Sequence, residues 1–186
     1  MSKKILCFIA AIMLAGISIA QVNWKTIETA TKMDNSKTEK LYFVDFYTSW
    51  CGWCKKMDKE TFQDPVVSKI LNKYYIPVKF DAEGINTFTW KGTEYKGSPS
   101  PAGSRKQPHQ FARAILGQKM GYPTTAIFKA DQTTLNVLPG YFKAEEFVVI
   151  LWYFASGDYT KYSWEQYNKI FNSQIRPKMN KSLGIK

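Results

Sequence analysis

Residues 41–55 read LYFVDFYTSWCGWCK and hold the two features on which the fold prediction rests. The first seven residues are apolar on both alternating faces apart from Asp45, which is typical of a central strand covered by helices on both sides. Cys51 and Cys54 follow, where a helix running to about Glu60 is expected to begin. Residues three apart on a helix are neighbours, with Cβ atoms about 5–6 Å apart, so the two sulfurs can join with little backbone movement. This stretch predicts an α/β fold with a redox-active cysteine pair at a helix N-terminus.

The position of the two cysteines predicts a division of labour between them. At the start of a helix, unpaired amide N–H groups and the positive end of the helix dipole stabilise a thiolate on Cys51, and Lys55 and Lys56 add positive charge in the same turn. The thiolate is the nucleophile in thiol–disulfide exchange, so Cys51 is expected to be the exposed, attacking thiol. Cys54, one turn deeper and more shielded, is then expected to resolve the mixed disulfide.

Asp45 is the third candidate catalytic residue. An ionised carboxylate is costly to bury in a strand of Leu, Tyr, Phe and Val, so its pKa is expected to be raised. Beneath the cysteines, it could accept the proton of Cys54 during resolution. The alternative is that Asp45 faces solvent at the end of the strand.

Residues 44–55 resemble the signature of the thioredoxin superfamily, with an acidic residue six positions before the first cysteine and a tryptophan immediately before it. Residues 121–125, GYPTT, resemble the cis-proline loop of the same superfamily. The resemblance implies a thioredoxin-like three-layer sandwich with a mixed central sheet. It also implies that Pro123 faces the disulfide and that the backbone of Tyr122 pairs with an extended substrate. The candidate substrate-binding residues are Trp50, Trp53, Tyr122 and Pro123.

Residues 55–67 look closest to one branch, which includes the C-terminal exported domain of the transmembrane thiol:disulfide interchange protein, a relay of reducing equivalents. The resemblance covers about residues 41–155, with an insertion at about 82–109 and a C-terminal extension at about 157–186. Trp53 is a departure, because ordinary thioredoxins carry proline between the cysteines. The aromatic residues of the two added segments are expected to form either satellite core or a partner surface: Phe88, Trp90, Tyr95, Tyr159, Tyr162 and Trp164.

The remaining elements follow from periodicity, capping residues and turn signals. They are a helix at 24–33 capped by Asn23, a helix from Pro65 capped by Asp64, a strand at 75–81, a hairpin at 88–95, a loop at 97–108, a helix at 110–119, strands at 124–129 and 133–138, a helix at 144–155, and a last helix capped by Ser163.

The first residues have the pattern of a signal peptide. A positive start at residues 3–4 precedes an uncharged apolar run at 5–17, and small residues lead to a cleavage site after Ala20. Cleavage would remove Cys7 and leave one domain, 21–186, in the periplasm or secreted. The alternative is an uncleaved anchor, for which the apolar run is short compared with the about 20 residues that a spanning helix needs.

Charge and ligand chemistry limit the partners. The formal net charge is +11, but the basic residues are scattered and form no nucleic-acid motif, so neither nucleic acid nor a membrane surface is predicted as a partner.

Half of a zinc site is a competing interpretation of Cys-x-x-Cys. Such sites usually have four ligands, and the mature chain adds only His109, which is expected to be a surface or capping residue. We expect neither a metal nor another cofactor, and a monomer.

The leading hypothesis is an exported thiol:disulfide oxidoreductase of the protein-disulfide reductase type. Its partners would be substrate proteins with disulfides and an upstream thiol electron donor, membrane-embedded if the branch resemblance holds. A net oxidase or isomerase is the second hypothesis, because direction depends on reduction potential and partner. A third is a binding module without turnover, which would need none of Cys51, Cys54 and Asp45.

Overall fold

The computed structural model of the chain describes residues 21–35, 37–104, 106–118 and 120–185. The predicted signal segment lies outside the described residues. Within them, no helix is both long and apolar enough to cross a membrane.

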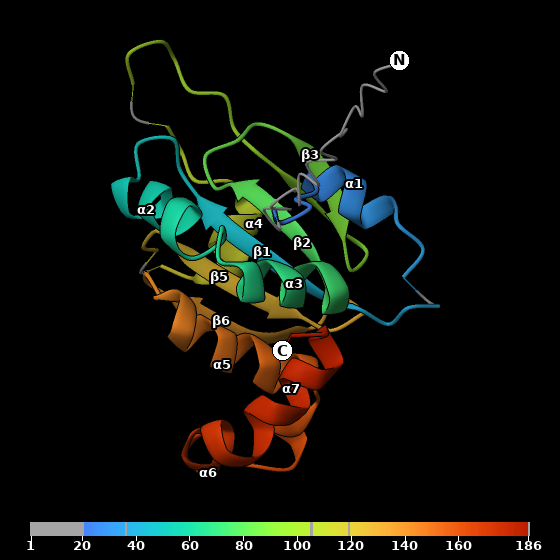
Figure 1. Ribbon diagram of the computed structural model, residues 1–186. Coiled ribbons are helices and arrows are strands. Elements are labelled where there is room, and N and C mark those ends of the chain that lie inside the picture. The colour runs from blue at the N-terminus through green and yellow to red at the C-terminus, as the bar shows by residue number, and fades with distance from the viewer. Residues whose placement is uncertain (1–20, 36, 105, 119, 186) are drawn as a thin grey trace, which may run out of the picture.

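One mixed sheet organises the molecule (Figure 1). Its strand order is β2-β1-β5-β6, in which β1 and β2 are parallel and the other neighbours are antiparallel. β1 is therefore a central strand, as its apolar pattern predicted. The strands are β1 (Leu41–Tyr47), β2 (Tyr75–Asp81), β5 (Thr124–Phe128) and β6 (Thr134–Pro139).

Helices cover both faces of this sheet. Alternate residues of β1 divide between two cores: Phe43 packs into one, and Tyr42 and Val44 pack into the other. The core around Phe43 is shared with α2 (Gly52–Glu60), α3 (Pro65–Tyr74) and α5 (Ala144–Ala155). The opposite core is shared with α1 (Ile27–Lys32), α4 (Gln110–Leu116) and the hairpin of β3 (Thr87–Trp90) and β4 (Thr93–Lys96). The predicted thioredoxin-like three-layer sandwich is confirmed.

The aromatic residues of the two added segments differ in burial. Phe88 and Trp90 of the hairpin are buried in the second core, where Trp90 meets the ring of Tyr42 at 5.1 Å between centroids. Satellite core is therefore correct for the hairpin. In the C-terminal segment, Tyr162 and Trp164 are exposed.

The first helix begins later than predicted. Its N-cap is Thr26, whose side chain accepts a hydrogen bond from the Thr29 N–H, and the proposed cap Asn23 lies outside the helix. Long-range pairing is the reason. The backbone N–H of Lys25 donates to the carbonyl of Pro77 at 2.8 Å, and Lys25 forms a parallel bridge with Val78. This backbone is therefore held against the edge of β2 and cannot start a helix.

The end of α4 and the C-terminal segment also differ from prediction. α4 ends at Leu116, because Gly117 adopts a positive φ of 72° that stops the helix before the predicted residue 119. The predicted single last helix is three pieces: α6 (Trp164–Ile170), a π-helical turn (Phe171–Ile175) and α7 (Arg176–Leu183). Pro177 lacks a backbone N–H, so the α-helical hydrogen-bond ladder is interrupted just before α7.

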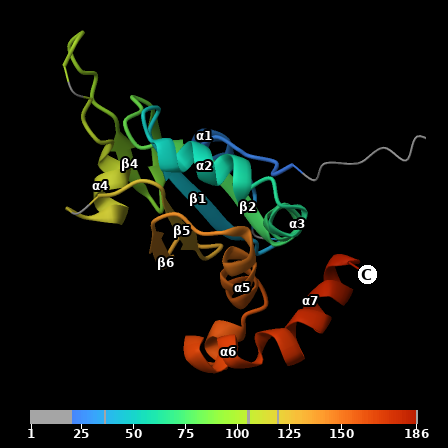
Figure 2. The ribbon, with the colours of Figure 1, turned by 60° about the vertical axis from the view of Figure 1, so that its left-hand side comes forward.

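The C-terminal segment lies beyond α5 on the side away from the sheet (Figure 2). Tyr167, Phe171, Ile175 and Met179 extend the core of α5, and α7 returns to α3, where the Tyr74 hydroxyl lies 2.5 Å from the Ser182 hydroxyl. Ser163 caps α6 as predicted, in a capping box with Gln166.

Candidate active site

The cysteine pair lies at the start of α2, shortly after β1 ends. Cys51 is the N-cap of α2, and its Sγ accepts a hydrogen bond from the backbone N–H of Cys54 at 3.0 Å. The two residues form a disulfide, with Cα atoms 5.3 Å apart. The free amides of a first helical turn and the positive end of the helix dipole favour negative charge on a sulfur in this position. The pair can therefore exchange between a disulfide and a dithiol whose thiolate is favoured on Cys51.

In the disulfide form both cysteines are buried, with Cys51 4% exposed and Cys54 3% exposed. The expectation of an exposed Cys51 thiol beside a shielded Cys54 concerns the reduced protein and stays a prediction. Each sulfur of a disulfide shields the other. The expected preference for a thiolate on Cys51 rather than on Cys54 therefore rests on the N-cap position of Cys51.

The Lys56 ammonium lies against neighbouring groups of α2 and Tyr141. The Lys56 ammonium lies 5.0 Å from the centroid of the Trp53 ring and 5.4 Å from that of Tyr141, and it is 3.9 Å from a Glu60 oxygen. Its charge is thus partly matched by these groups. A thiolate on Cys51 is therefore expected from the helix terminus and not from Lys56.

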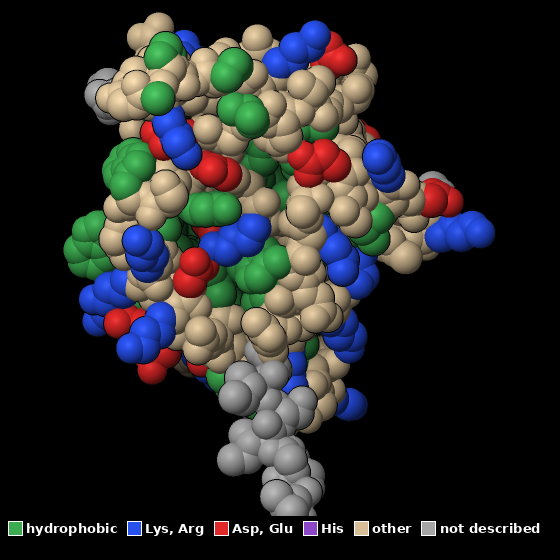
Figure 3. Space-filling view, turned by 90° about the horizontal axis from the view of Figure 1, so that it is seen from above, with side chains coloured by type: hydrophobic (Ala, Val, Ile, Leu, Met, Phe, Trp, Pro, Cys, Tyr) green, Lys and Arg blue, Asp and Glu red, His purple; other side chains and the backbone are tan. Residues whose placement is uncertain are grey.

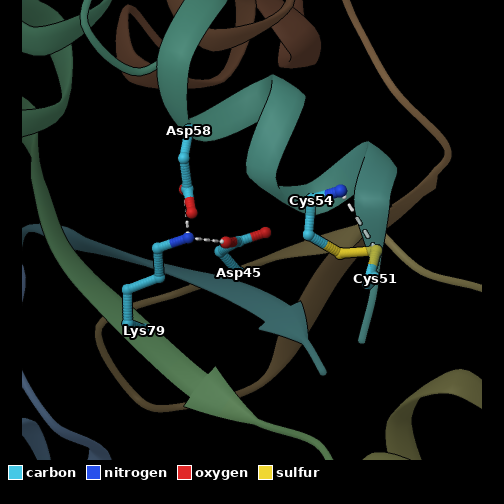
Figure 4. A network of polar contacts seen from close by, with 5 residues as sticks. All are labelled: Asp45, Cys51, Cys54, Asp58 and Lys79. Carbon is cyan, nitrogen blue, oxygen red and sulfur yellow. Dashed lines mark hydrogen bonds and ion pairs between the residues drawn. A yellow bond between two sulfur atoms is a disulfide. The ribbon is translucent and has the colours of Figure 1, made fainter. Parts of the chain in front are cut away.

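Asp45 is buried on the α2 side of the sheet, at 1% exposure, which excludes the solvent-facing alternative. Its Oδ2 accepts a hydrogen bond from the Lys79 ammonium at 2.6 Å, and Oδ1 has no hydrogen-bond partner. In Figure 4 that second oxygen points away from Lys79, on the side of the cysteine pair. Burial raises the pKa of Asp45 from 3.8 to about 6; the Lys79 ammonium opposes the rise and Asp58 adds to it. The predicted rise in pKa is confirmed.

Lys79, which the sequence did not single out, holds the Asp45 carboxylate in place. It is paired with Asp45 in the register of β1 and β2, and it also forms an ion pair with Asp58 of α2 (Figure 4). Three aromatic rings surround its ammonium, with centroids 5.1 to 5.3 Å away: Trp24, Tyr47 and Phe62. Burial alone would lower the pKa of Lys79, but the two carboxylates outweigh that effect and raise it. Lys79 therefore stays cationic beside Asp45.

Two features of the sequence are consistent with this network. Lys79 is the only charged residue inside the otherwise apolar strand before Asp81, and Asp58 lies one helical turn after Cys54. Their meeting depends on the parallel register of β1 and β2, which no local pattern states.

The two candidate tryptophans make separate ring contacts. The Tyr122–Pro123 peptide bond is cis, and Pro123 is buried just before β5, with its carbonyl accepting the Gly140 N–H at 2.8 Å. The rings of Tyr122 and Trp50 meet edge to face, 6.1 Å between centroids. Trp53 instead contacts Tyr141, at 5.5 Å. Trp50 and Trp53 are 62% and 55% exposed, so both are available to a partner.

A pocket of about 310 Å³ opens beside Trp50. The Trp50 indole N–H donates a hydrogen bond of 3.0 Å to Oε2 of Glu83, a second residue that the sequence did not single out. The pocket is lined by Trp50, Glu83, Lys106, Gln107, Pro108, Met120, Gly121 and Tyr122.

One face of the molecule carries both signs of charge. Seen from above, Lys and Arg side chains alternate with Asp and Glu, and hydrophobic side chains show at one edge and in a central hollow (Figure 3).

Among the described residues, no three His, Cys, Asp or Glu side chains are grouped to hold a metal ion. His109 lies away from the cysteines: it is buried and caps α4, where its Nδ1 accepts the Phe111 N–H. Capping was therefore the correct expectation for His109, and a surface position was wrong.

A mixed sheet between helical layers, with a cysteine pair at a helix N-cap, defines a thioredoxin-like protein. The chain belongs to the thioredoxin-like domain family, which matches residues 27–155, more than half of its length.

The comparisons with individual proteins agree with this family. The chain is 34% identical over 55 residues to the thiol:disulfide interchange protein DsbD of Haemophilus influenzae, a match covering 28% of this chain and 10% of that protein. The chain thus spans about a tenth of that relative. Among solved structures, it resembles a DsbH oxidoreductase, with a TM-score of 0.51 and 16% identity over 83% of this chain and 95% of the other. A thioredoxin-fold protein from Helicobacter pylori gives a TM-score of 0.50 and 16% identity over 77% and 86%. At such identities the likeness shows the fold.

Proposed function

We propose that the chain is an exported thiol:disulfide oxidoreductase that reduces protein disulfides through Cys51 and Cys54. The observation that carries the proposal is the N-cap position of the Cys51 sulfur, with the unpartnered Asp45 oxygen on the side of the pair. Pure binding of extended chains would need neither group, so the binding-module alternative explains less.

Reduction proceeds by two exchange steps. The Cys51 thiolate attacks one sulfur of the substrate disulfide, forming a mixed disulfide and releasing the other substrate sulfur as a thiolate. Asp45 Oδ1 then accepts the proton of Cys54, whose thiolate attacks the Cys51 sulfur and releases the second substrate thiolate. The substrate gains two electrons, and the enzyme is left as the Cys51–Cys54 disulfide. A base with a pKa of about 6 is well matched to proton transfer near neutral pH.

The remaining parts of the proposal concern placement and partners. The mature enzyme is a monomeric domain of residues 21–186, released into the periplasm or secreted after cleavage behind Ala20. An upstream thiol donor, membrane-embedded as the resemblance to the DsbD branch suggests, returns the pair to the dithiol state. Trp50, Trp53, Tyr122 and Pro123 border the groove in which the substrate segment lies.

Reduction of insulin by the mature, prereduced protein tests the activity. We expect turnover with a thiol donor present, no turnover for Cys51→Ser, and a several-fold slower rate for Asp45→Asn near neutral pH, because the proton acceptor is gone. Asp58→Asn is the matched control, since it removes the more exposed of the two carboxylates that bind Lys79.

The oxidoreductase activity and the general-base role of Asp45 can fail separately in this experiment. Insulin left unreduced by the wild-type protein would contradict the oxidoreductase function. A wild-type rate for Asp45→Asn across neutral pH would leave the activity standing but remove the general-base role of Asp45.

A further inference from the structure

The pocket beside Trp50 is lined by the neighbours in sequence of two residues of the proposed active site. Trp50 immediately precedes Cys51, and Tyr122 immediately precedes the cis proline. Its volume of about 310 Å³ is at the small end of the roughly 300–1,000 Å³ usual for ligand pockets. It therefore suits one side chain of a bound segment and is small for a whole cofactor.

Part of the wall is apolar, and the lining includes one buried carboxylate. Trp50 and Tyr122 present aromatic rings, and Met120 and Pro108 add apolar surface. Glu83 is only 8% exposed, and its Oε2 is fixed by the Trp50 indole N–H. Aromatic rings attract cations through their faces, and a carboxylate forms its strongest hydrogen bonds with cationic donors. This combination complements a long side chain with an apolar stem and a positive head.

Two carboxylates, those of Glu83 and Asp81, act on the pocket residue Tyr122. Burial raises the pKa of the Tyr122 hydroxyl, and the carboxylates of Glu83 and Asp81 raise it further. Lys106 also lines the pocket, but its side chain is exposed and forms no ion pair with a described residue. Among the described residues, Glu83 therefore has no ion-pair partner, and its side-chain hydrogen bond comes from the neutral Trp50 indole.

The outer wall, residues 106–108, belongs to a loop that is anchored at both ends. At one end, Gly97 donates its N–H to the Asn86 carbonyl at 3.0 Å, and a Cβ here would lie 2.0 Å from the Gly84 oxygen, so only glycine fits. At the other end, the His109 N–H donates to the Ala82 carbonyl at 2.7 Å, and its Nε2 lies 2.9 Å from the Asn86 carbonyl. The wall is thus fixed to the segment that carries Glu83.

We propose that this pocket binds a lysine or arginine side chain that flanks the disulfide-bonded cysteine of the substrate, with the carboxylate of Glu83 as its partner. The proposal rests on the proposed disulfide exchange and names the substrate class of the same site. The proposed preference for a cationic side chain is opposite to the preference expected from the net charge of +11, which by itself would favour acidic substrates. A preference for cationic substrates is therefore not a default of the protein.

Three synthetic peptides with one intramolecular disulfide test it, differing only in the residue beside the attacked cysteine: arginine, norleucine or glutamate. The second-order rate constant for reduction by the prereduced protein is measured for each. We expect the arginine peptide to react about tenfold faster than the norleucine peptide, the equivalent of about 1.4 kcal/mol, and the glutamate peptide to react slowest. Glu83→Gln should bring the arginine and norleucine rates together.

Two further variants complete the test. Glu94→Gln removes the same charge from an exposed ion pair on the hairpin and should leave the discrimination unchanged. Lys106→Glu, at an exposed position, should increase the preference for the arginine peptide. If Glu83→Gln does not fold, the rates of Lys106→Glu decide the test. Equal wild-type rates for the arginine and norleucine peptides, or discrimination that survives in Glu83→Gln, would overturn the proposal. A wild-type protein that reduces none of the peptides would contradict the proposed function itself.

Discussion

Replacing Asp45 by asparagine in the oxidised protein should change how stability depends on pH. The carboxyl is 1% exposed, and burial raises its pKa from 3.8 to about 6 despite the opposing Lys79 ammonium. In the unfolded chain the same carboxyl is solvated and titrates near 3.8. The folded state therefore binds this proton more tightly than the unfolded state does.

The magnitude follows from the gap between the two pKa values. At about 1.36 kcal/mol for each pH unit, a gap from 3.8 to about 6 corresponds to about 3 kcal/mol. Well below pH 3.8 the carboxyl is protonated in both states, so its titration does not change the free energy of unfolding. As the pH rises towards 6, the unfolded state ionises while the folded state stays protonated, so the free energy of unfolding of the wild type falls. Above pH 6 the loss is complete.

Asparagine has the same shape and does not titrate, so the variant escapes this loss. The free energy of unfolding of Asp45→Asn, minus that of the wild type, should rise by about 3 kcal/mol between about pH 3.5 and 7.5. All other carboxyls titrate in both proteins and cancel. The disulfide must stay intact during the experiment, so that cysteine thiols do not titrate in the same range.

Urea denaturation at a series of pH values measures this difference. Asp58→Asn is the control: it removes a partner of the same lysine, but its carboxylate is 44% exposed, so its difference from the wild type should stay within about 1 kcal/mol at every pH. Parallel stability curves for Asp45→Asn and the wild type would show that Asp45 does not resist ionisation in the fold, and the reasoning from burial would be refuted.

The other predictions concern the exchange chemistry. A limiting alkylating reagent should label Cys51 of the reduced protein first, because its thiolate is favoured at the helix terminus, and Cys54→Ser should trap mixed disulfides that Cys51→Ser does not; preferential labelling of Cys54 would reverse the assignment. Equilibration in glutathione buffers should give a reduction potential nearer to about −270 mV than to about −120 mV, and a value at the oxidising end would favour a net oxidase. Trp53→Ala should move that potential by less than about 30 mV, since Trp53 is an apolar neighbour of the disulfide; a larger shift would make it a determinant of direction. Lys79→Met should shift the acid limb of the pH–rate profile of exchange to higher pH, because the cation that lowers the pKa of Asp45 is lost; an unmoved limb would separate Asp45 from the rate.

Local patterns in the sequence were sufficient for most elements of the fold. The apolar run interrupted by Asp45 predicted a covered central strand, and Asp64 before Pro65 predicted the start of α3, where the Asp64 carboxylate indeed accepts the N–H of Val66 and of Val67. The Cys-x-x-Cys spacing predicted two sulfurs within bonding distance on one helix turn. Each of these signals is contained within a few consecutive residues, whose own propensities and hydrogen bonds decide the outcome.

The errors arose where distant segments compete with local preference. Residues 24–26 have an acceptable helical pattern, but Lys25 pairs with the edge of β2 and remains extended. His109 caps α4 as one of its two predicted roles required, but the predicted surface position is wrong, because contacts with Ala82 and Asn86 hold it in the interior.

The sequence alone determined the reactive pair, the central strand and the buried carboxylate of this protein. Only the tertiary structure decided their surroundings: Lys79 beside Asp45, the aromatic rings around it, and Glu83 beneath Trp50. The reason is physical. Capping and periodicity act between residues within one or two turns of each other. Trp50 and Glu83 are 33 positions apart and Asp45 and Lys79 are 34 apart, and the parallel pairing of β1 with β2 brings these segments together.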